Sequence, residues 1–380
     1  MVDLSARADR LDAYLSETGL EAVWFARPNS FAWLVGGSNV GVVGEKDGFG
    51  VAAAGYDGTF RVIVPTNEAD RFRDEELPDR VSIETFPWYE SSLAVAIAER
   101  SPSPATADIP IDRSGFETLD ASRLRQPLSE ADREDYRELG REAAAAVETV
   151  CRQLESTDPE YEVAAAIEIA LASRDVSTPV VLVGGGDRAR RYPNPTPSDA
   201  ELGEYAIVSV TVERAGLYAS LTRTVAFDAP DWLEERHRAA ARIEATALAA
   251  TRAAIRGELN DGETIATSGD VFAVIREAYD AVGFPEEWRT HHQGGAAGFD
   301  TREWIATPEG DDPVTAPMGY AWNPTVVGAK SEDTYLLSSD RSEILTKTGQ
   351  WPTVEVDPID VEALDGGSTP SLERHTPIVL

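Results

Sequence analysis

The chain has 380 residues, enough for two domains with separate hydrophobic cores, and carries 67 acidic against 34 basic side chains. The formal net charge of −33 makes nucleic acid and anionic membranes poor partners, because both are negatively charged. Apolar residues make up 42% of the chain and follow helical and strand periods, which excludes an acidic disordered protein.

Lysine is rare in this sequence, with only Lys46, Lys330 and Lys347 among the basic residues. In molar salt the Debye length shrinks to roughly 3 Å, so an acidic surface no longer repels itself strongly. The composition therefore predicts a protein from a salt-accumulating halophile. Cys151 is the single cysteine, so we expect a small core residue and no disulfide. No apolar run approaches about 18 residues and no leader pattern opens the chain, and we expect a cytoplasmic protein.

The first third predicts a small α/β domain. Apolar residues at helical spacing predict a helix that starts near Leu4 and stops at Gly19. A further helix is expected between Thr66, as its cap, and Pro78, as its end. The remaining elements are a helix at 92–100 and strands at 22–26, 48–54, 59–65, 81–86 and 108–111.

A domain boundary is predicted near Arg125, which divides the chain into domains 1–125 and 126–380. Ser129 and Asp132 have the spacing of a capping box, and they predict a long helix that continues to about Leu154. The elements expected beyond it are helices at 159–173, 231–256 and 271–282 and strands at 179–183, 205–214 and 217–227. This order of helices and antiparallel strands favours an α+β fold over a parallel doubly wound sheet.

Two neighbouring histidines, His291 and His292, precede the glycine pair Gly294 and Gly295. Imidazoles beside glycines can reach a ligand, because glycine lets the backbone come close to it. The alternative is a pair of loop histidines satisfied by backbone hydrogen bonds.

Arginines mark two further candidate segments. Arg223 lies between two threonines at the end of a predicted strand, either on a solvated face or facing an anion. Arg191 closes the densest basic run of the chain, after three glycines, and such a loop can hold a carboxylate or phosphate. Surface arginines paired with acids explain the same run. His237 and His375 are expected to be solvated.

Several segments, taken in order, resemble the creatinase/aminopeptidase P/prolidase superfamily. They are R-x-x-R-L-x-x-Y-L, GLEAVWFARPNSFAWLVGG and TNEADRF in the first domain, and YAIVSVTVERAGLYASLTRTVAF, HHQGG, WNP and KSEDT in the second. The resemblance implies a small creatinase-type N-terminal domain and a C-terminal pita-bread domain, whose curved antiparallel sheet is flanked by helices. It also implies a homodimer.

The metalloenzyme members of this superfamily hold two divalent ions with two aspartates, one histidine and two glutamates. The resemblance carries these positions over to Ser209 or Thr211, Ser220, His292 or His291, Asn323, and Glu332. One carboxylate and one imidazole cannot neutralise two divalent ions, so we expect no dinuclear metal site and no cofactor. A single weakly bound ion remains compatible with this set.

Creatinase works on this scaffold without metal, and the resemblance places its catalytic histidine at Asn194. An amide cannot act as a general base near neutral pH, so the sequence departs from that layout too. A third catalytic arrangement uses His292 as acid/base, oriented by Glu332. His291 takes this role if it is the one that matches the superfamily's histidine. Side chains that the fold should bring near an anionic substrate are Arg223, Arg191, Lys330, Asn194 and Asn323.

Three functions follow from the resemblance. The first is hydrolysis of a C–N bond in a small carboxylate-bearing substrate without a dinuclear metal site. The second is a catalytically silent protein that binds a small anionic or peptide ligand, and the third is a metal-dependent Xaa-Pro peptidase. The hairpin argues against the third, because no aspartate occurs between Glu204 and Phe227.

Overall fold

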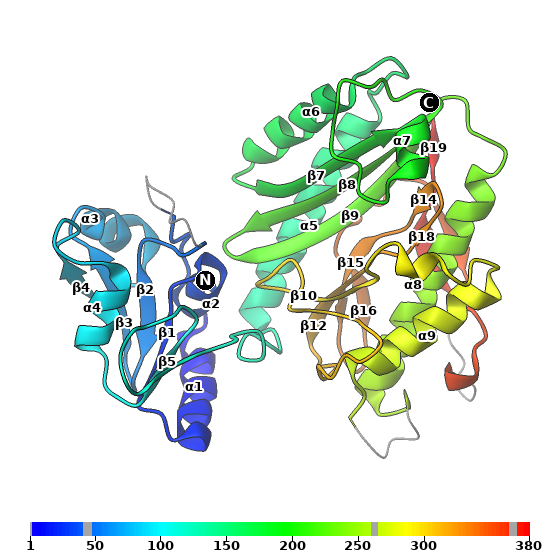
Figure 1. Cartoon of the computed structure of the whole chain (residues 1–380). Coiled ribbons are helices and arrows are strands. Elements are labelled where there is room, and N and C mark those ends of the chain that lie inside the picture. The colour runs from blue at the N-terminus through cyan, green and yellow to red at the C-terminus, as the bar shows by residue number, and fades with distance from the viewer. Residues whose placement is uncertain (1, 41–47, 260–264, 365–370) are drawn as a thin grey trace. The chain divides into compact units, whose positions relative to one another are not determined.

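The computed structural model describes residues 2–40, 48–259, 265–364 and 371–380. Contacts divide the chain into two compact units (Figure 1). One comprises Met1–Asp132 and Ala215–Leu217, and the other Arg133–Arg214 and Tyr218–Leu380. That the predicted domains 1–125 and 126–380 fold independently stays a prediction. No helix in the described part of the chain combines the length and apolar character needed to cross a membrane.

The first unit contains a six-stranded mixed sheet with the order β4-β3-β2-β1-β5-β6. Its strands are β1 (Ala22–Phe25), β2 (Ala53–Tyr56), β3 (Phe60–Pro65), β4 (Ser82–Phe86), β5 (Ala105–Ala107) and β6 (Phe116–Thr118). Its helical segments are α1 (Leu4–Thr18), α2 (Pro28–Val35), α3 (Ala69–Arg71), the π-helix η1 (Phe72–Glu76) and α4 (Leu93–Arg100). The helix α1 ends as predicted, because Gly19 adopts a left-handed φ of 71° that favours glycine.

Three expectations for this unit need correction. Thr66 does not cap a helix; the short α3 begins only at Ala69, after Glu68. The strand expected at 108–111 lies earlier, at β5, and Asp108 follows it. The Asp108 carboxylate accepts the backbone N–H groups of Ala26 and Arg27 at 2.7 and 3.1 Å. The strand expected at 48–54 begins only at Ala53, as β2. In addition, the helix α2 was not predicted.

The second unit is built around the long helix α5 (Glu130–Cys151), which contains the point of division. The predicted capping box is present: the Ser129 N–H donates to the Asp132 carboxylate at 2.9 Å, and the Asp132 N–H donates to Ser129 Oγ at 3.2 Å. Cys151 is fully buried, as expected for a core residue.

Two sheets make up the rest of this unit, a four-stranded one with the order β19-β9-β8-β7 and a five-stranded one with the order β11-β10-β12-β15-β16. The strands of the first are β7 (Ser177–Gly185), β8 (Tyr205–Arg214), β9 (Leu217–Ala226) and β19 (Ile378–Val379). Those of the second are β10 (Gly294–Ala297), β11 (Trp304–Ile305), β12 (Met318–Trp322), β15 (Asp333–Leu337) and β16 (Ser342–Ile344). All pairs in the second sheet are antiparallel, in agreement with the α+β prediction.

The helices of this unit are α6 (Glu160–Ala172), α7 (Gly186–Arg191), α8 (Leu233–Arg256) and α9 (Ser268–Ala281). The minor elements are η3 (Glu287–Arg289), η4 (Glu362–Leu364) and the strands β13 (Thr325–Val326), β14 (Ala329–Lys330), β17 (Thr353–Val356) and β18 (Leu372–His375). The helix α8 packs against β12 and β14 (Figure 1).

The start of β15 lies against β9, and this contact positions the candidate site. The Thr222 N–H donates to the Glu332 carbonyl at 3.0 Å, and the Ser220 N–H donates to Thr334 Oγ1 at 2.7 Å. In the pairing of β12 with β15, Trp322 lies opposite Asp333. Asn323 and Glu332, one step beyond that pair, therefore lie at the same end of the sheet.

Candidate functional site

A cavity of about 200 Å³ lies within the second unit, at the end of β12 and β15 where Asn323 and Glu332 meet. Polar side chains from segments far apart in the sequence line it. Those that matter for chemistry are Asn194, His292, Arg302, Asn323, Lys330 and Glu332.

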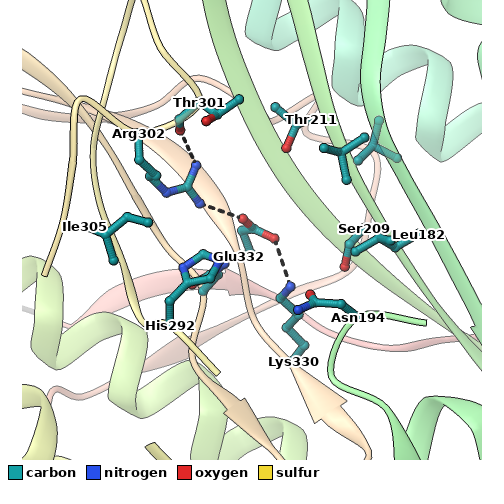
Figure 2. A pocket seen from close by; sticks show the side chains of 13 residues that line it. Leu182, Asn194, Ser209, Thr211, His292, Thr301, Arg302, Ile305, Lys330 and Glu332 are labelled. Atoms are coloured by element: carbon teal, nitrogen blue, oxygen red, sulfur yellow. Dashed lines mark hydrogen bonds and ion pairs between the residues drawn. The ribbon is translucent and has the colours of Figure 1, made fainter. Parts of the chain in front are cut away.

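Glu332 is the carboxylate of this cavity and is buried. Its Oε1 accepts a hydrogen bond from Arg302 Nη2 at 3.0 Å, its Oε2 accepts one from Thr222 Oγ1 at 2.7 Å, and Lys330 Nζ is 3.7 Å from Oε2. Figure 2 shows the carboxylate between these two cations. Burial alone would raise the pKa of Glu332, but Lys330 and Arg302 outweigh it and hold the pKa below its ordinary value.

Arg302 is a site residue that the sequence analysis missed. It lies between β10 and β11, and its side chain is only 8% exposed. Its Nη1 donates to Ser220 Oγ at 3.2 Å, whereas its Nε has no hydrogen-bond partner among the described residues. An isolated arginine in a loop carries no sequence signal for such a role, because only the fold brings residues 302 and 332 together.

Lys330 was expected in the site and lines the cavity; it is buried at the end of β14. Burial lowers the pKa of its ammonium group; Glu332 opposes this shift and Arg302 adds to it. The cavity thus holds two buried basic side chains against one carboxylate.

The histidine pair is divided between two environments. His292 lines the cavity beside Glu332 (Figure 2), and burial together with Arg302 and Lys330 lowers its pKa to about 4. Its imidazole is therefore neutral near pH 7. His291 stacks on His292 with ring centroids 4.4 Å apart, and its Nδ1 contacts the His292 carbonyl. Burial strongly lowers the pKa of His291 as well.

The glycines after these histidines serve strand packing. A Cβ on Gly294, whose φ is +96°, would lie 2.1 Å from the Ala321 carbonyl oxygen, and one on Gly295 would lie 2.1 Å from that of Trp304. The close backbone approach that the sequence suggested is thus made to neighbouring strands.

The two asparagines of the predicted site both line the cavity. The Asn194 Oδ1 is 3.1 Å from His291 Nε2, so this amide holds the stacked imidazole. Asn323 is 3% exposed, and its Oδ1 has no hydrogen-bond partner among the described residues.

Hydroxyl groups stand at the positions that the resemblance assigns to metal-binding aspartates. Ser209 Oγ is 2.8 Å from Thr222 Oγ1, which donates to Glu332, and Thr211 Oγ1 is 2.9 Å from Ser220 Oγ. These residues form a neutral hydrogen-bonded wall beside the carboxylate.

Arg223, by contrast, is fully buried outside the cavity lining. It pairs with Glu148 and with Asp333, each at 3.1 Å. Successive side chains along an extended chain point to opposite faces. Asp333 therefore faces the buried Arg223 and Glu148, while the preceding residue, Glu332, faces the cavity. His375 belongs to the same cluster, with Nδ1 2.7 Å from the Asp333 carboxylate.

The remaining predicted residues also lie elsewhere. Arg191 is exposed on α7 and stacks over Tyr192, with 5.3 Å from its guanidinium carbon to the ring centroid. The prediction that His237 and His375 are solvated is wrong: they are 7% and 6% exposed, because α8 and β18 turn them into the core.

The described residues contain no group of three or more histidine, cysteine, aspartate or glutamate side chains placed to hold a metal ion.

Comparison with known structures gives the same fold over most of the chain. Prolidase from Pyrococcus furiosus is 18% identical, with a TM-score of 0.68 and coverage of 89% of this chain and 99% of that one. X-Pro aminopeptidase from Thermotoga maritima MSB8 is 17% identical, with a TM-score of 0.70 and coverage of 90% and 98%. The N-terminal domain of FACT complex subunit SPT16 from chickpea is 14% identical, with a TM-score of 0.64 and coverage of 92% and 98%.

A search of curated proteins returned no match. The family model of metallopeptidase family M24 matches residues 134–339, more than half of the chain and nearly all of the segments that line the cavity. Together with the structural neighbours, this match confirms the superfamily that the sequence motifs indicated. The chain belongs to metallopeptidase family M24.

Proposed function

We propose that this protein binds a small carboxylate-bearing ligand in the Glu332 cavity, without a dinuclear metal site. The observation that carries the proposal is the excess of buried basic side chains over carboxylates in the cavity lining. Arg302 and Lys330 face a single carboxylate there, although the chain as a whole has a net charge of −33.

An uncompensated buried cation is costly, and a ligand carboxylate supplies the missing negative charge. Arg302 is suited to this role because a guanidinium offers five donors in a planar fork, of which Glu332, Ser220 and Thr301 occupy only part.

The donor set does not fit a divalent cation. Both oxygens of Glu332 accept hydrogen bonds from protein donors, and two cationic side chains lie where a metal ion would need anionic oxygen. The other candidate ligands are neutral hydroxyls, an amide and an imidazole. This chemistry disfavours a metal-dependent Xaa-Pro peptidase.

Hydrolysis of a C–N bond in the bound ligand is the second candidate. It is favoured by His292, whose imidazole lies in the lining beside Glu332 and is unprotonated near pH 7, although a pKa of about 4 makes it a weak base. In this reaction Arg302 and Lys330 would hold the substrate carboxylate, and His292 would activate the attacking water.

Binding is tested by thermal melting and calorimetric titration of the protein in molar KCl with acetate and propionate. Wild-type protein should be stabilised, whereas Arg302→Gln and Lys330→Met should lose at least about tenfold in affinity, as expected for a charge-assisted contact. Arg341→Gln is the matched control, because that side chain is 69% exposed. Equal affinities for wild type and both cavity variants would contradict the proposal.

Turnover is tested separately with dipeptides, ureas and guanidino acids. A hydrolase should lose activity in His292→Ala while retaining carboxylate binding. Ligand-induced stabilisation without turnover of any of these compounds identifies a binding protein. Elemental analysis that finds two stoichiometric metal ions per chain would instead favour the metal-dependent peptidase and contradict the proposed absence of a dinuclear site.

A further inference from the structure

The Asn323 amide has a buried oxygen that the described residues leave without a hydrogen-bond donor. Its backbone is fixed at the end of β12, where its N–H donates to the Gln293 carbonyl at 3.0 Å. The side chain is 3% exposed and lines the cavity, and its Oδ1 has no hydrogen-bond partner among the described residues.

Such an acceptor is unfavourable in the empty cavity, because a buried carbonyl oxygen without a donor bears its full desolvation penalty. The neighbouring amide does not share the problem, since Asn194 lies 3.1 Å from His291 Nε2. Of the two amides in the cavity lining, Asn323 is thus the one with an unmet acceptor, and a ligand in the cavity could supply the donor.

The same cavity contains an unmet donor, the Nε of Arg302. A ligand that satisfies both must carry an anionic acceptor for Arg302 and Lys330 and a hydrogen-bond donor for Asn323. A volume of about 200 Å³ limits it to a small molecule.

We propose that Asn323 selects small acids that carry an amino or hydroxyl group next to the carboxylate. Their carboxylate binds Arg302 and Lys330, and their N–H or O–H group donates to Asn323 Oδ1. This inference rests on the proposed carboxylate binding and adds a specificity that binding alone does not require.

Four ligands of nearly equal size test it on the wild-type protein: propionate, pyruvate, lactate and alanine. Lactate should bind at least about threefold more tightly than propionate. Alanine should also bind more tightly than propionate, but with a smaller gain than lactate, because Arg302 and Lys330 repel its ammonium group. Pyruvate, which offers an acceptor in place of a donor, should show no gain over propionate.

The variant Asn323→Leu, of nearly the same shape, should lose the preference for lactate and alanine, measured as the ratio of their affinities to that of propionate in the same variant. Asn323→Ala is a second variant for the case in which leucine perturbs the fold. Asn67→Leu, in the first unit, is the control and should behave as wild type.

The outcomes separate the two proposals. Equal affinities for all four ligands in wild type, or a preference for pyruvate, would overturn the role of Asn323 and leave carboxylate binding intact. A preference that survives in both Asn323 variants would do the same. Binding of none of the four ligands would instead remove the proposed function.

Discussion

Glu332 is the counter-charge to the buried side chains of Arg302 and Lys330 in the cavity. It is 5% exposed and lies within 3.0 Å of Arg302 and 3.7 Å of Lys330, so its removal would leave two buried cations without a counter-charge. Buried cations without a counter-charge lower the free energy of unfolding, because the protein interior cannot solvate them as water does.

The change Glu332→Gln should therefore destabilise the protein by about 3–5 kcal/mol, the usual cost of breaking a buried ion pair from one side. The double change Glu332→Gln with Lys330→Met should recover part of this loss, because one unpaired cation is removed. Denaturant unfolding in molar KCl measures both. A single variant as stable as wild type, or a double variant no better than the single one, would show that these charges are not coupled.

At the scale of the strand, β15 and the residue before it lie between two polar environments, the cavity and a buried cluster of charged side chains. Glu332 faces the cavity, while Asp333 faces a buried cluster next to α8. In that cluster Glu244 accepts from the Asp333 N–H at 3.1 Å and from Ser331 Oγ at 2.5 Å, and Arg374 lies 3.3 Å away. Burial raises the pKa of Glu244 to about 7, and the carboxylate of Asp333 adds to this shift while Arg374 opposes it.

The raised pKa of Glu244 determines how the free energy of unfolding changes with pH. Between about pH 4.5, the ordinary value for glutamate, and about pH 7, the folded protein holds a proton that the unfolded chain has released. The contribution of Glu244 to the free energy of unfolding therefore falls as the pH rises through that window, by at most about 1.4 kcal/mol per pH unit.

The variant Glu244→Gln should remove this slope, so its stability relative to wild type should improve from pH 5 to pH 8. Chemical denaturation at constant molar salt across that range measures the difference. A difference that stays constant over the whole range would contradict the assignment. Glu343→Gln, a partly exposed carboxylate on β16, is the control.

Elements with a clear apolar period were predictable from the sequence. The helices α1, α4, α5, α6, α8 and α9 and the strands β7, β8 and β9 lie within a few residues of their expected positions. The strand β5 and the helix α2 were not predicted at their positions. A three-residue strand has too few positions to show a period, and α2 is buried on nearly every side, so it lacks a polar face.

At the scale of the whole molecule the dominant feature is charge. With a net charge of −33, the folded chain repels itself unless salt screens it. At about 10 mM salt the Debye length is roughly 30 Å, so acidic groups across the whole protein interact.

Dialysis from molar KCl to about 10 mM salt should therefore unfold the protein, with loss of helical circular dichroism that returns when salt is restored. Sucrose at equal osmolality is the control and should not replace the salt, because it screens no charge. An unchanged spectrum at low salt would contradict the halophilic interpretation. The homodimer that the superfamily resemblance implies also stays a prediction, and light scattering in molar salt tests it.

The sequence by itself determined the acidic composition, the superfamily and the identity of the side chains at the positions that the resemblance assigns to metal ligands, because these depend on composition and on motifs in a fixed order. It also placed Lys330, Asn323, His292 and Glu332 in one site through that order. Only the tertiary structure decided that Arg302 joins them and that Arg223 faces away. The register of β9 against β15 and the alternation of side chains along a strand set which charges meet, and neither can be read from residues that lie far apart in the chain.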